Sequence, residues 1–241
     1  MSFRDSAMMP TAPRQAQSGV TLTEVLVGLV IGLVAVAVAV QTLATLQVTQ
    51  SETSQRLALQ SSVRYVLSNI AREIRHAGSA QLSDSTDHSV VLTPFSPPAV
   101  RIDPSTSELT LQYATPFASD NVGCLWRQST TLGPSVTSHY ALKGRSLRCT
   151  NNGFTQPLID GVLEFVTMLA IKTPSGLRWI TSNPDPSVQA LGLVVCLHVL
   201  GPPMQTPQAP VNDCTGQEVA ADGRLHVVEH QTTALNIGAW P

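Results

Sequence analysis

The chain has 241 residues and a formal net charge of −2, with 43% hydrophobic and only 12% charged residues. A chain of this length can bury the core of one soluble domain and still leave residues for a membrane anchor. It contains no block of Lys and Arg, so it lacks the basic surface that neutralises nucleic-acid phosphates. We therefore expect no direct nucleic-acid partner.

A long segment near the N-terminus contains no ionisable side chain, from Val25 to Ser51. Its first two-thirds consist almost wholly of Val, Leu, Ile, Ala and Gly. At about 1.5 Å per residue, a helix of this length crosses a hydrocarbon core of about 30 Å. We predict a transmembrane or fibre-core helix over residues 20–46.

Gly28 and Gly32 form a G-x-x-x-G pair within this apolar segment. Such a pair places two positions without side chains on one helix face, which allows a second helix to approach closely. Transmembrane helices are also rich in Gly for general reasons, so two scattered glycines without a partner are an equally valid interpretation. Both interpretations are open.

An ordinary secretory signal is an alternative explanation of the same segment. Ala35-Val36-Ala37 and Ala37-Val38-Ala39 both fit an A-x-A cleavage site, and Arg4 and Arg14 lie upstream of the apolar run. Glu24 argues against this alternative, because it places a carboxylate at the start of the apolar run, where a secretory signal has basic and uncharged residues.

The run from Ser18 to Glu24, Ser-Gly-Val-Thr-Leu-Thr-Glu, followed by the apolar segment, resembles the class III prepilin motif of type IV pilins and type II secretion pseudopilins. The resemblance implies that residues 1–19 are a leader that a prepilin peptidase removes after Gly19. It also implies that Val20 becomes the N-methylated N-terminus and that Glu24 guides assembly. A carboxylate in lipid is costly unless paired, and the amine of Val20 on a neighbouring subunit could neutralise it. The alternative is that Glu24 extends toward the lipid headgroups.

After the anchor, apolar residues recur at spacings of three and four, which predicts an amphipathic helix. The apolar positions are Val63, Val66, Leu67, Ile70 and Ile74, and charged residues at 64, 72, 73 and 75 lie between them. Ala77-Gly78 offers a C-terminal stop. Because no Pro occurs between Pro13 and Pro94, we predict one unbroken helix from about Val20 to His76, with residues 47–78 as its amphipathic continuation.

Residues 79–241 show no helical periodicity and predict short strands separated by Pro, Gly, Ser and Asn. The strand candidates are Glu108–Tyr113, Val122–Trp126, His139–Leu142, Leu147–Cys149, Val162–Ile171, Leu191–Leu200 and Leu225–Ile237. The expected fold class is α+β: a pilin-like lollipop in which one long N-terminal helix packs on a mostly antiparallel β-sheet domain, a periplasmic globular domain over 79–241.

Several blocks of the chain resemble the PilW family of minor pilins. Residues 63–78 are similar to the family's (G)RYAL-x-x-L-x-R-D-I-R-x-A-G signature, and 109–114, 146–149 and 157–162 resemble further blocks in the expected order. The resemblance implies a structural minor pilin that helps initiate or cap type IV pilus assembly near the fibre tip. Its partners would be other minor pilins, the major pilin and the inner-membrane assembly platform.

The same resemblance implies a single-pass inner-membrane protein with a periplasmic C-terminal domain, which becomes extracellular in the assembled pilus. A J-type minor pseudopilin of a type II secretion system is built similarly and stays as an alternative. A secreted or membrane-tethered periplasmic enzyme or binding domain is a more distant one, which the Gly19 and Glu24 pair disfavours.

The four cysteines lie at 124, 149, 196 and 214, with no C-x-x-C pair, so a zinc site is not expected. In an exported domain an even number favours disulfides, and four cysteines allow three pairings. We favour Cys124 with Cys149 and Cys196 with Cys214, because these pairings close the shortest loops. The resemblance to the PilW family also implies the pairing of Cys124 with Cys149. Free buried thiols are the alternative, particularly for Cys196 in its apolar run.

One stretch, His226-Val-Val-Glu229-His230, matches the H-x-x-E-H pattern of a metalloprotease class. That site requires a helix, whereas Val227, Val228 and the following Thr residues favour a strand. The sequence also lacks G-x-S-x-G, a Gly-rich phosphate loop and a metal-spaced carboxylate pair. We predict no enzyme activity, no catalytic residue, no metal and no cofactor.

Overall fold

The computed structural model describes residues 19–79, 81–84, 90–93, 99–103, 105–106, 108–114, 123–125, 135–151, 153–182, 190–206 and 208–235. The chain divides into two compact units, Met1–Ser51 and Glu52–Pro241, and each is described by itself. The division falls inside the long helix, a few residues after the predicted end of the anchor.

Helix α1 spans Leu22–His76 as one element of 55 residues, which confirms the prediction of an unbroken helix. Arg75 and His76 lie in its last turn, where cations interact favourably with the helix dipole. The chain leaves the helix through Gly78, whose φ of 74° is left-handed, and the Gly78 amide donates to the Gln112 carbonyl. The predicted Ala77-Gly78 stop is therefore confirmed, with a glycine in the conformation that glycine tolerates best.

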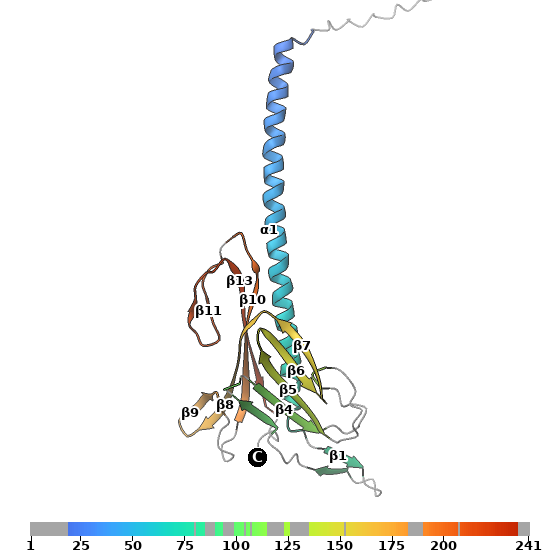
Figure 1. The fold of residues 1–241 in the computed structure, drawn as a ribbon, viewed down its shortest axis with the longest axis vertical. Helices are drawn as coiled ribbons and strands as arrows, with labels where there is room; N and C mark the ends of the chain where they lie inside the picture. The colour runs from blue at the N-terminus through green and yellow to red at the C-terminus, as the bar shows by residue number, and fades with distance from the viewer. Residues whose placement is uncertain are drawn as a thin grey trace, which may run out of the picture. The chain divides into compact units, whose positions relative to one another are not determined.

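The described strands of the second unit form two larger sheets and two small hairpins, all antiparallel (Figure 1). The first sheet has the order β3-β4-β5-β6-β7, and its strands are Val100–Asp103, Glu108–Ala114, Ser135–Lys143, Ser146–Asn151 and Phe154–Asp160. The second sheet has the order β13-β10-β8-β9, with strands Arg224–Ala234, Ala190–Pro203, Val162–Thr173 and Gly176–Ile180. The hairpins pair β1 (Gln81–Asp84) with β2 (Val90–Thr93), and β11 (Val211–Asn212) with β12 (Glu218–Val219).

Five of the seven strand predictions are confirmed as β4, β5, β6, β8 and β10. A sixth, Leu225–Ile237, is right in type but ends at Ala234, and its last two residues lie outside the described chain. The prediction for Val122–Trp126 is wrong in its described part, since Cys124 and Leu125 lie in a turn. The Cys124 amide donates to the Ser138 hydroxyl, so a side chain and not a strand ladder satisfies it.

The strands of the predicted β-sheet domain form two larger sheets, and Gly161 is the corner between them. It is the only residue between β7 of the first sheet and β8 of the second. Its φ is 80°, its carbonyl accepts from the Leu200 amide, and a Cβ here would lie 2.6 Å from the Leu200 carbonyl oxygen. Both the conformation and the close approach require glycine.

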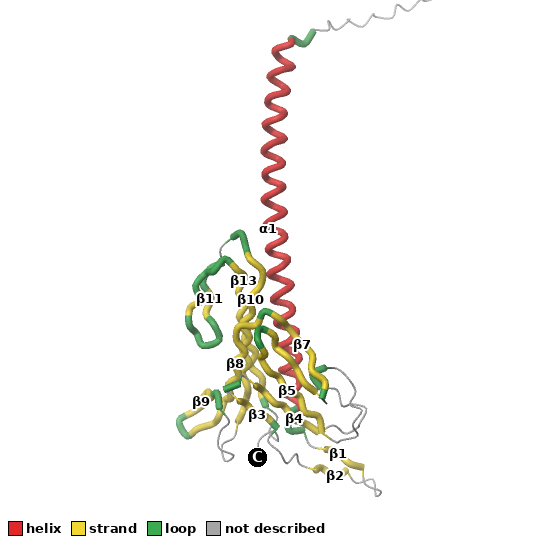
Figure 2. The backbone as a smooth tube through the Cα atoms, viewed as in Figure 1, coloured by secondary structure: helices red, strands yellow, loops and turns green. Residues whose placement is uncertain are grey.

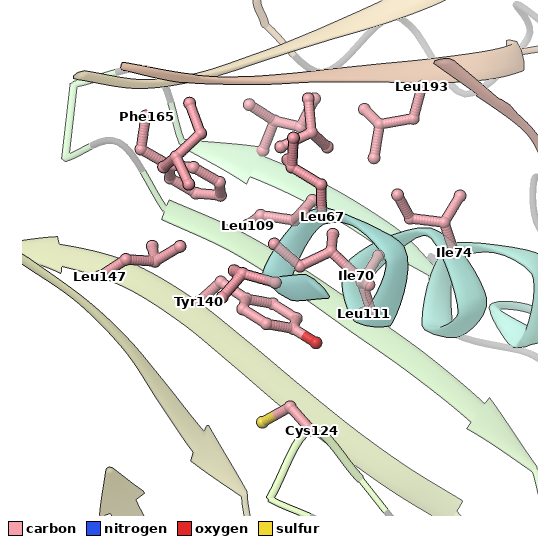
Figure 3. Close-up of a cluster of buried hydrophobic side chains, with 14 of the residues drawn as sticks. Leu67, Ile70, Ile74, Leu109, Leu111, Cys124, Tyr140, Leu147, Phe165 and Leu193 are labelled. Carbon is pink, nitrogen blue, oxygen red and sulfur yellow. The ribbon is translucent and has the colours of Figure 1, made fainter. Parts of the chain in front are cut away.

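The second part of α1, Glu52–His76, supplies one side of the core of the second unit. Its predicted apolar stripe is confirmed: Val63, Val66, Leu67, Ile70 and Ile74 are all buried. Figure 3 shows Leu67, Ile70 and Ile74 packed among side chains from both sheets, including Leu109 and Leu111 of β4, Tyr140 of β5 and Leu193 of β10. Figure 2 shows the helix in red and the strands in yellow. The fold class is thus α+β, a long N-terminal helix packed on antiparallel sheets, as predicted.

Candidate processing and assembly site

The predicted cleavage site lies immediately before α1. Gly19 and Val20 are both exposed and outside any helix or strand, and a Cβ added at Gly19 would meet nothing within 4 Å. Exposed backbone outside regular structure is what a peptidase can engage. The geometry is therefore compatible with cutting between these two residues.

Thr21 is the N-cap of α1. Its carbonyl accepts from the amides of Glu24 and Val25 at 3.0 and 3.2 Å, and its hydroxyl Oγ1 lies 3.4 Å from the Glu24 amide nitrogen. Thr21 and Glu24 therefore occupy the first and last positions of the T-x-x-E capping box. This role was not predicted, although the spacing in the sequence could have revealed it.

Glu24 lies in the first turn of α1, where the positive end of the helix dipole favours a carboxylate. Its side chain is exposed and makes no hydrogen bond or ion pair with the described residues of the chain. The carboxylate is thus free to accept a cation from outside its own chain, and it also has a local reason to be at this position.

All side chains from Leu22 to Gln50 are exposed in the chain by itself. The mean hydropathy of the most apolar 18 residues is 2.5, and α1 is the one helix in the described chain long and apolar enough to cross a membrane. A Cβ added at Gly28 or Gly32 would meet nothing within 4 Å. No described residue therefore packs on the G-x-x-x-G face, and its role stays a prediction.

The four cysteines form two disulfides in the second unit, with the pairing favoured from loop length. Cys124–Cys149 joins the turn at residues 123–125 to β6, and Cys196–Cys214 joins β10 to the β11–β12 hairpin. The Cα atoms are 6.3 and 5.7 Å apart, within the usual range for disulfides. The described region contains no free cysteine.

A buried carboxyl that the sequence did not indicate lies between α1 and the first sheet. Glu73 is 3% exposed, and its Oε2 accepts a hydrogen bond of 2.8 Å from the Tyr140 hydroxyl. Burial raises the pKa of Glu73 to about 7, although the Tyr140 hydrogen bond acts to lower it. Figure 3 shows Tyr140 beneath the helix, its hydroxyl at the edge of the apolar cluster. The carboxyl is a buried contact between α1 and β5.

The H-x-x-E-H residues lie on strand β13, as predicted, and not on a helix. Four residues along a strand separate His226 from His230 by about 13 Å, too far for both to bind one metal ion. His226 instead contacts His198 at 3.0 Å and Asp222 at 2.9 Å, while Glu229 pairs with Arg64 at 3.0 Å. The described residues contain no group of three or more ligands that could hold a metal.

Glu164 links His198 to the β11–β12 hairpin. Glu164 lies 3.6 Å from His198 and accepts a hydrogen bond from the amide of Cys214 in the hairpin. Burial lowers the pKa of His198, the principal effect, while Glu164 acts in the opposite direction. This polar cluster is explained by packing and includes no nucleophile.

Comparison with known proteins agrees with this geometry. Residues 14–40 match the family described as the prokaryotic N-terminal methylation motif. The fold is similar to that of a type IV-like pilin from Thermus thermophilus, with a TM-score of 0.51 and 13% identity over 76% of this chain and 97% of that one. The chain thus combines a prokaryotic N-terminal methylation motif with a fold similar to that of a type IV-like pilin.

A second solved structure has a lower similarity. It is the GspK-GspI-GspJ complex from the type 2 secretion system of enterotoxigenic Escherichia coli, with a TM-score of 0.37 and 11% identity over 73% of this chain and 96% of the matched chain. Comparison with curated protein sequences gives no match.

Proposed function

We propose that the protein is a structural minor pilin of the PilW family that helps to initiate or cap type IV pilus assembly, together with other minor pilins near the fibre tip. The observation that carries the proposal is the union of an N-terminal methylation motif with a pilin-like fold in one chain. The protein would act by assembly and not by catalysis.

In this proposal a prepilin peptidase cuts after Gly19, and Val20 becomes the methylated N-terminus. The exposed apolar part of α1 then anchors the subunit in the inner membrane, with the second unit in the periplasm. During assembly the same apolar surface moves from lipid to the helices of other pilins. This transfer is favourable only if the polar groups at the start of the helix find partners, because the fibre core excludes water.

Glu24 and the amine of Val20 on a neighbouring subunit would be those partners. The Glu24 carboxylate has no partner in the described part of its own chain, and a free amine at the same depth is a cation. In a dry contact, loss of one member of such a pair costs about 3–5 kcal/mol. In a single subunit, the carboxylate can extend to the headgroups at little cost.

The test separates the charge of Glu24 from the helix cap, which is made by the Thr21 hydroxyl and the Glu24 amide. Glu24→Gln removes the charge and keeps a side chain of the same shape, whereas Glu24→Ala removes the whole side chain; neither changes the capping hydroxyl. Thr21→Val removes the capping hydroxyl and retains the charge. We expect both Glu24 variants to be cut after Gly19 and held in the membrane but to enter fibres poorly, and Thr21→Val to assemble nearly normally.

The measurements are the mass of the mature N-terminus, the number of pili, and copurification of other minor pilins. Normal piliation and copurification with Glu24→Gln would rule out charge pairing, and uncut protein would assign Glu24 to peptidase recognition. A mature N-terminus near Val40 would remove the pilin proposal altogether. Deletion of the gene should abolish or reduce pili; loss of protein secretion with normal pili would instead identify a pseudopilin.

A further inference from the structure

The outer edge of β13 presents backbone groups that no strand in the described chain pairs with. Because the sheet order is β13-β10-β8-β9, β13 has β10 on one side only. Its residue His226 lies opposite Leu200, whose amide points away from β13 and donates to the Gly161 carbonyl. The amide and carbonyl of His226 likewise point away from β10, since both bond to the side chain of Gln208, at 2.8 and 2.9 Å.

This orientation fixes that of the residues further along the strand. Backbone groups in an antiparallel pair alternate between facing the partner strand and facing away from it. The register between β10 and β13 is regular from Leu200 back to Gly192, so Val228, His230 and Thr232 also direct their amides and carbonyls outward. At His226 the Gln208 amide takes the place of a neighbouring strand. Beyond it, no hydrogen bond to Val228 or His230 from outside the sheet is found in the described chain.

A pocket of about 320 Å³ lies along this edge. Five consecutive β13 residues, His226–His230, line it, together with Gln208, Val211 and Asn212 of the hairpin region and Arg56 and Gln60 of α1. Successive side chains of a strand point to opposite faces, so only the strand edge can bring five consecutive residues to one pocket. The pocket is therefore a slot beside the exposed backbone, at the lower end of the roughly 300–1,000 Å³ range of ligand pockets.

The charge around the slot is unbalanced. Glu229 is neutralised by Arg64, whose Nε and Nη2 both donate to the same carboxylate oxygen at 3.1 and 3.0 Å. Arg56 is exposed and has no ion pair among the described residues. The free charge that lines the slot is therefore positive.

We propose that this slot binds an extended acidic segment of a partner protein, which adds a strand to the edge of β13. Its backbone would pair with the outward groups of Val228 and His230, and a carboxylate on it would meet Arg56. An exposed edge supplies affinity through main-chain hydrogen bonds, and neighbouring side chains supply specificity. Gln208 fixes where the added strand must end. The inference uses only the second unit and does not depend on the proposed role in pili.

The test uses proline, which removes one amide and is tolerated on an edge strand where that amide faces outward. His230→Pro removes an outward amide within the slot and leaves the ladder to β10 intact. Thr232→Pro is the matched control, because its amide faces the same way but Thr232 does not line the pocket. Arg56→Glu reverses the unpaired charge on α1.

The probe is a synthetic four-residue peptide of valine and threonine with one glutamate, capped at both ends, which is long enough to pair with Val228 and His230 but too short to reach Thr232; it is titrated into the full chain in detergent micelles. A second peptide carries lysine in place of glutamate. In the free chain we expect the amides of Val228 and His230 to exchange hydrogen faster than those of Val227 and Glu229, which face β10. The glutamate peptide should slow exchange at Val228 and His230 selectively.

His230→Pro should weaken binding of the glutamate peptide by about tenfold, as loss of a backbone hydrogen bond implies, and Arg56→Glu by at least as much. Thr232→Pro should bind the glutamate peptide as tightly as the unmodified chain does. The two proline variants should have the same melting temperature. No protection at millimolar peptide, equal binding of the lysine peptide, or equal binding by both proline variants would each overturn the proposal. Protection that rises with protein concentration without peptide would assign the edge to a second copy, which would also overturn it.

Discussion

The two parts of α1 share one backbone conformation but differ in what stabilises their side chains. From Leu22 to Ser51 every side chain is exposed, although this part is the more apolar. From Glu52 to His76 one face is buried, and Val63, Ile70 and Ile74 are completely so. The apolar face of the second part is buried against strands of the same chain. The first part can bury its apolar surface only in lipid or against other molecules. Substitutions should therefore act on folding in one part and on assembly in the other.

The largest difference is expected between two isoleucines of the same helix. Ile70→Ala should lower the free energy of unfolding by about 2–5 kcal/mol, because it leaves a cavity at a fully buried site. Ile31→Ala should leave unfolding nearly unchanged, since Ile31 is 63% exposed. Denaturant unfolding of both variants in the same detergent measures this. Similar losses for the two would mean that the parts of α1 are not distinct in stability.

The disulfides should matter only to the second unit. They close loops with sequence separations of 25 and 18 residues, and each stabilises by about 3 kcal/mol in the chain-entropy model. Cys124→Ser should lower the free energy of unfolding of the second unit and the abundance of the protein in cells. It should not change the fraction of the protein that is found with membranes. Unfolding with and without reductant, and membrane fractionation, test the two statements. Four free thiols in non-reducing peptide mapping would contradict them.

Glu73 should make the stability of the second unit depend on pH. Because burial raises its pKa to about 7, the folded state favours the protonated carboxyl. This contribution is fully present below the unfolded pKa of about 4.5 and is lost as pH rises through about 7, a change of roughly 3 kcal/mol. Glu73→Gln can still accept from the Tyr140 hydroxyl and should remove this pH dependence. The free energy of unfolding is measured between pH 4.5 and 8 for both proteins. If it falls with pH as steeply in the variant as in the unmodified chain, Glu73 is not the source of the pH dependence.

The smallest effect on folding is expected at Gly28 and Gly32. Since a Cβ at either position would meet nothing within 4 Å among the described residues, Gly→Ala should change helix stability by less than about 1 kcal/mol. If the pair packs against another helix, Gly28→Leu and Gly32→Leu should still reduce copurification with other pilins. Ala37→Leu adds bulk on the opposite helix face and is the control. Equal copurification for all three would show that the glycines have no packing role.

Local patterns in the sequence were enough for the long helix and for most long strands. The 3.6-residue periodicity from Val63 to Ile74 identified the buried stripe correctly. Among the strands that were missed, β3 alternates apolar and polar residues but is only four residues long, whereas β7 and β9 are mostly exposed and have no buried side chain to mark one face. The turn at Cys124 was assigned as a strand because its neighbours are apolar, although its disulfide and the Ser138 hydroxyl hold it.

The sequence by itself determined the helix, the apolar character of its first part and the methylation motif, because these depend on residues close together in the chain. Only the tertiary structure decided that Gly161 divides the strands into two sheets, that Glu73 meets Tyr140, and that Arg56 lies beside the edge of β13. Each of these brings together residues far apart in sequence. Such contacts depend on how the sheets pack on α1, which spacing along the chain does not encode.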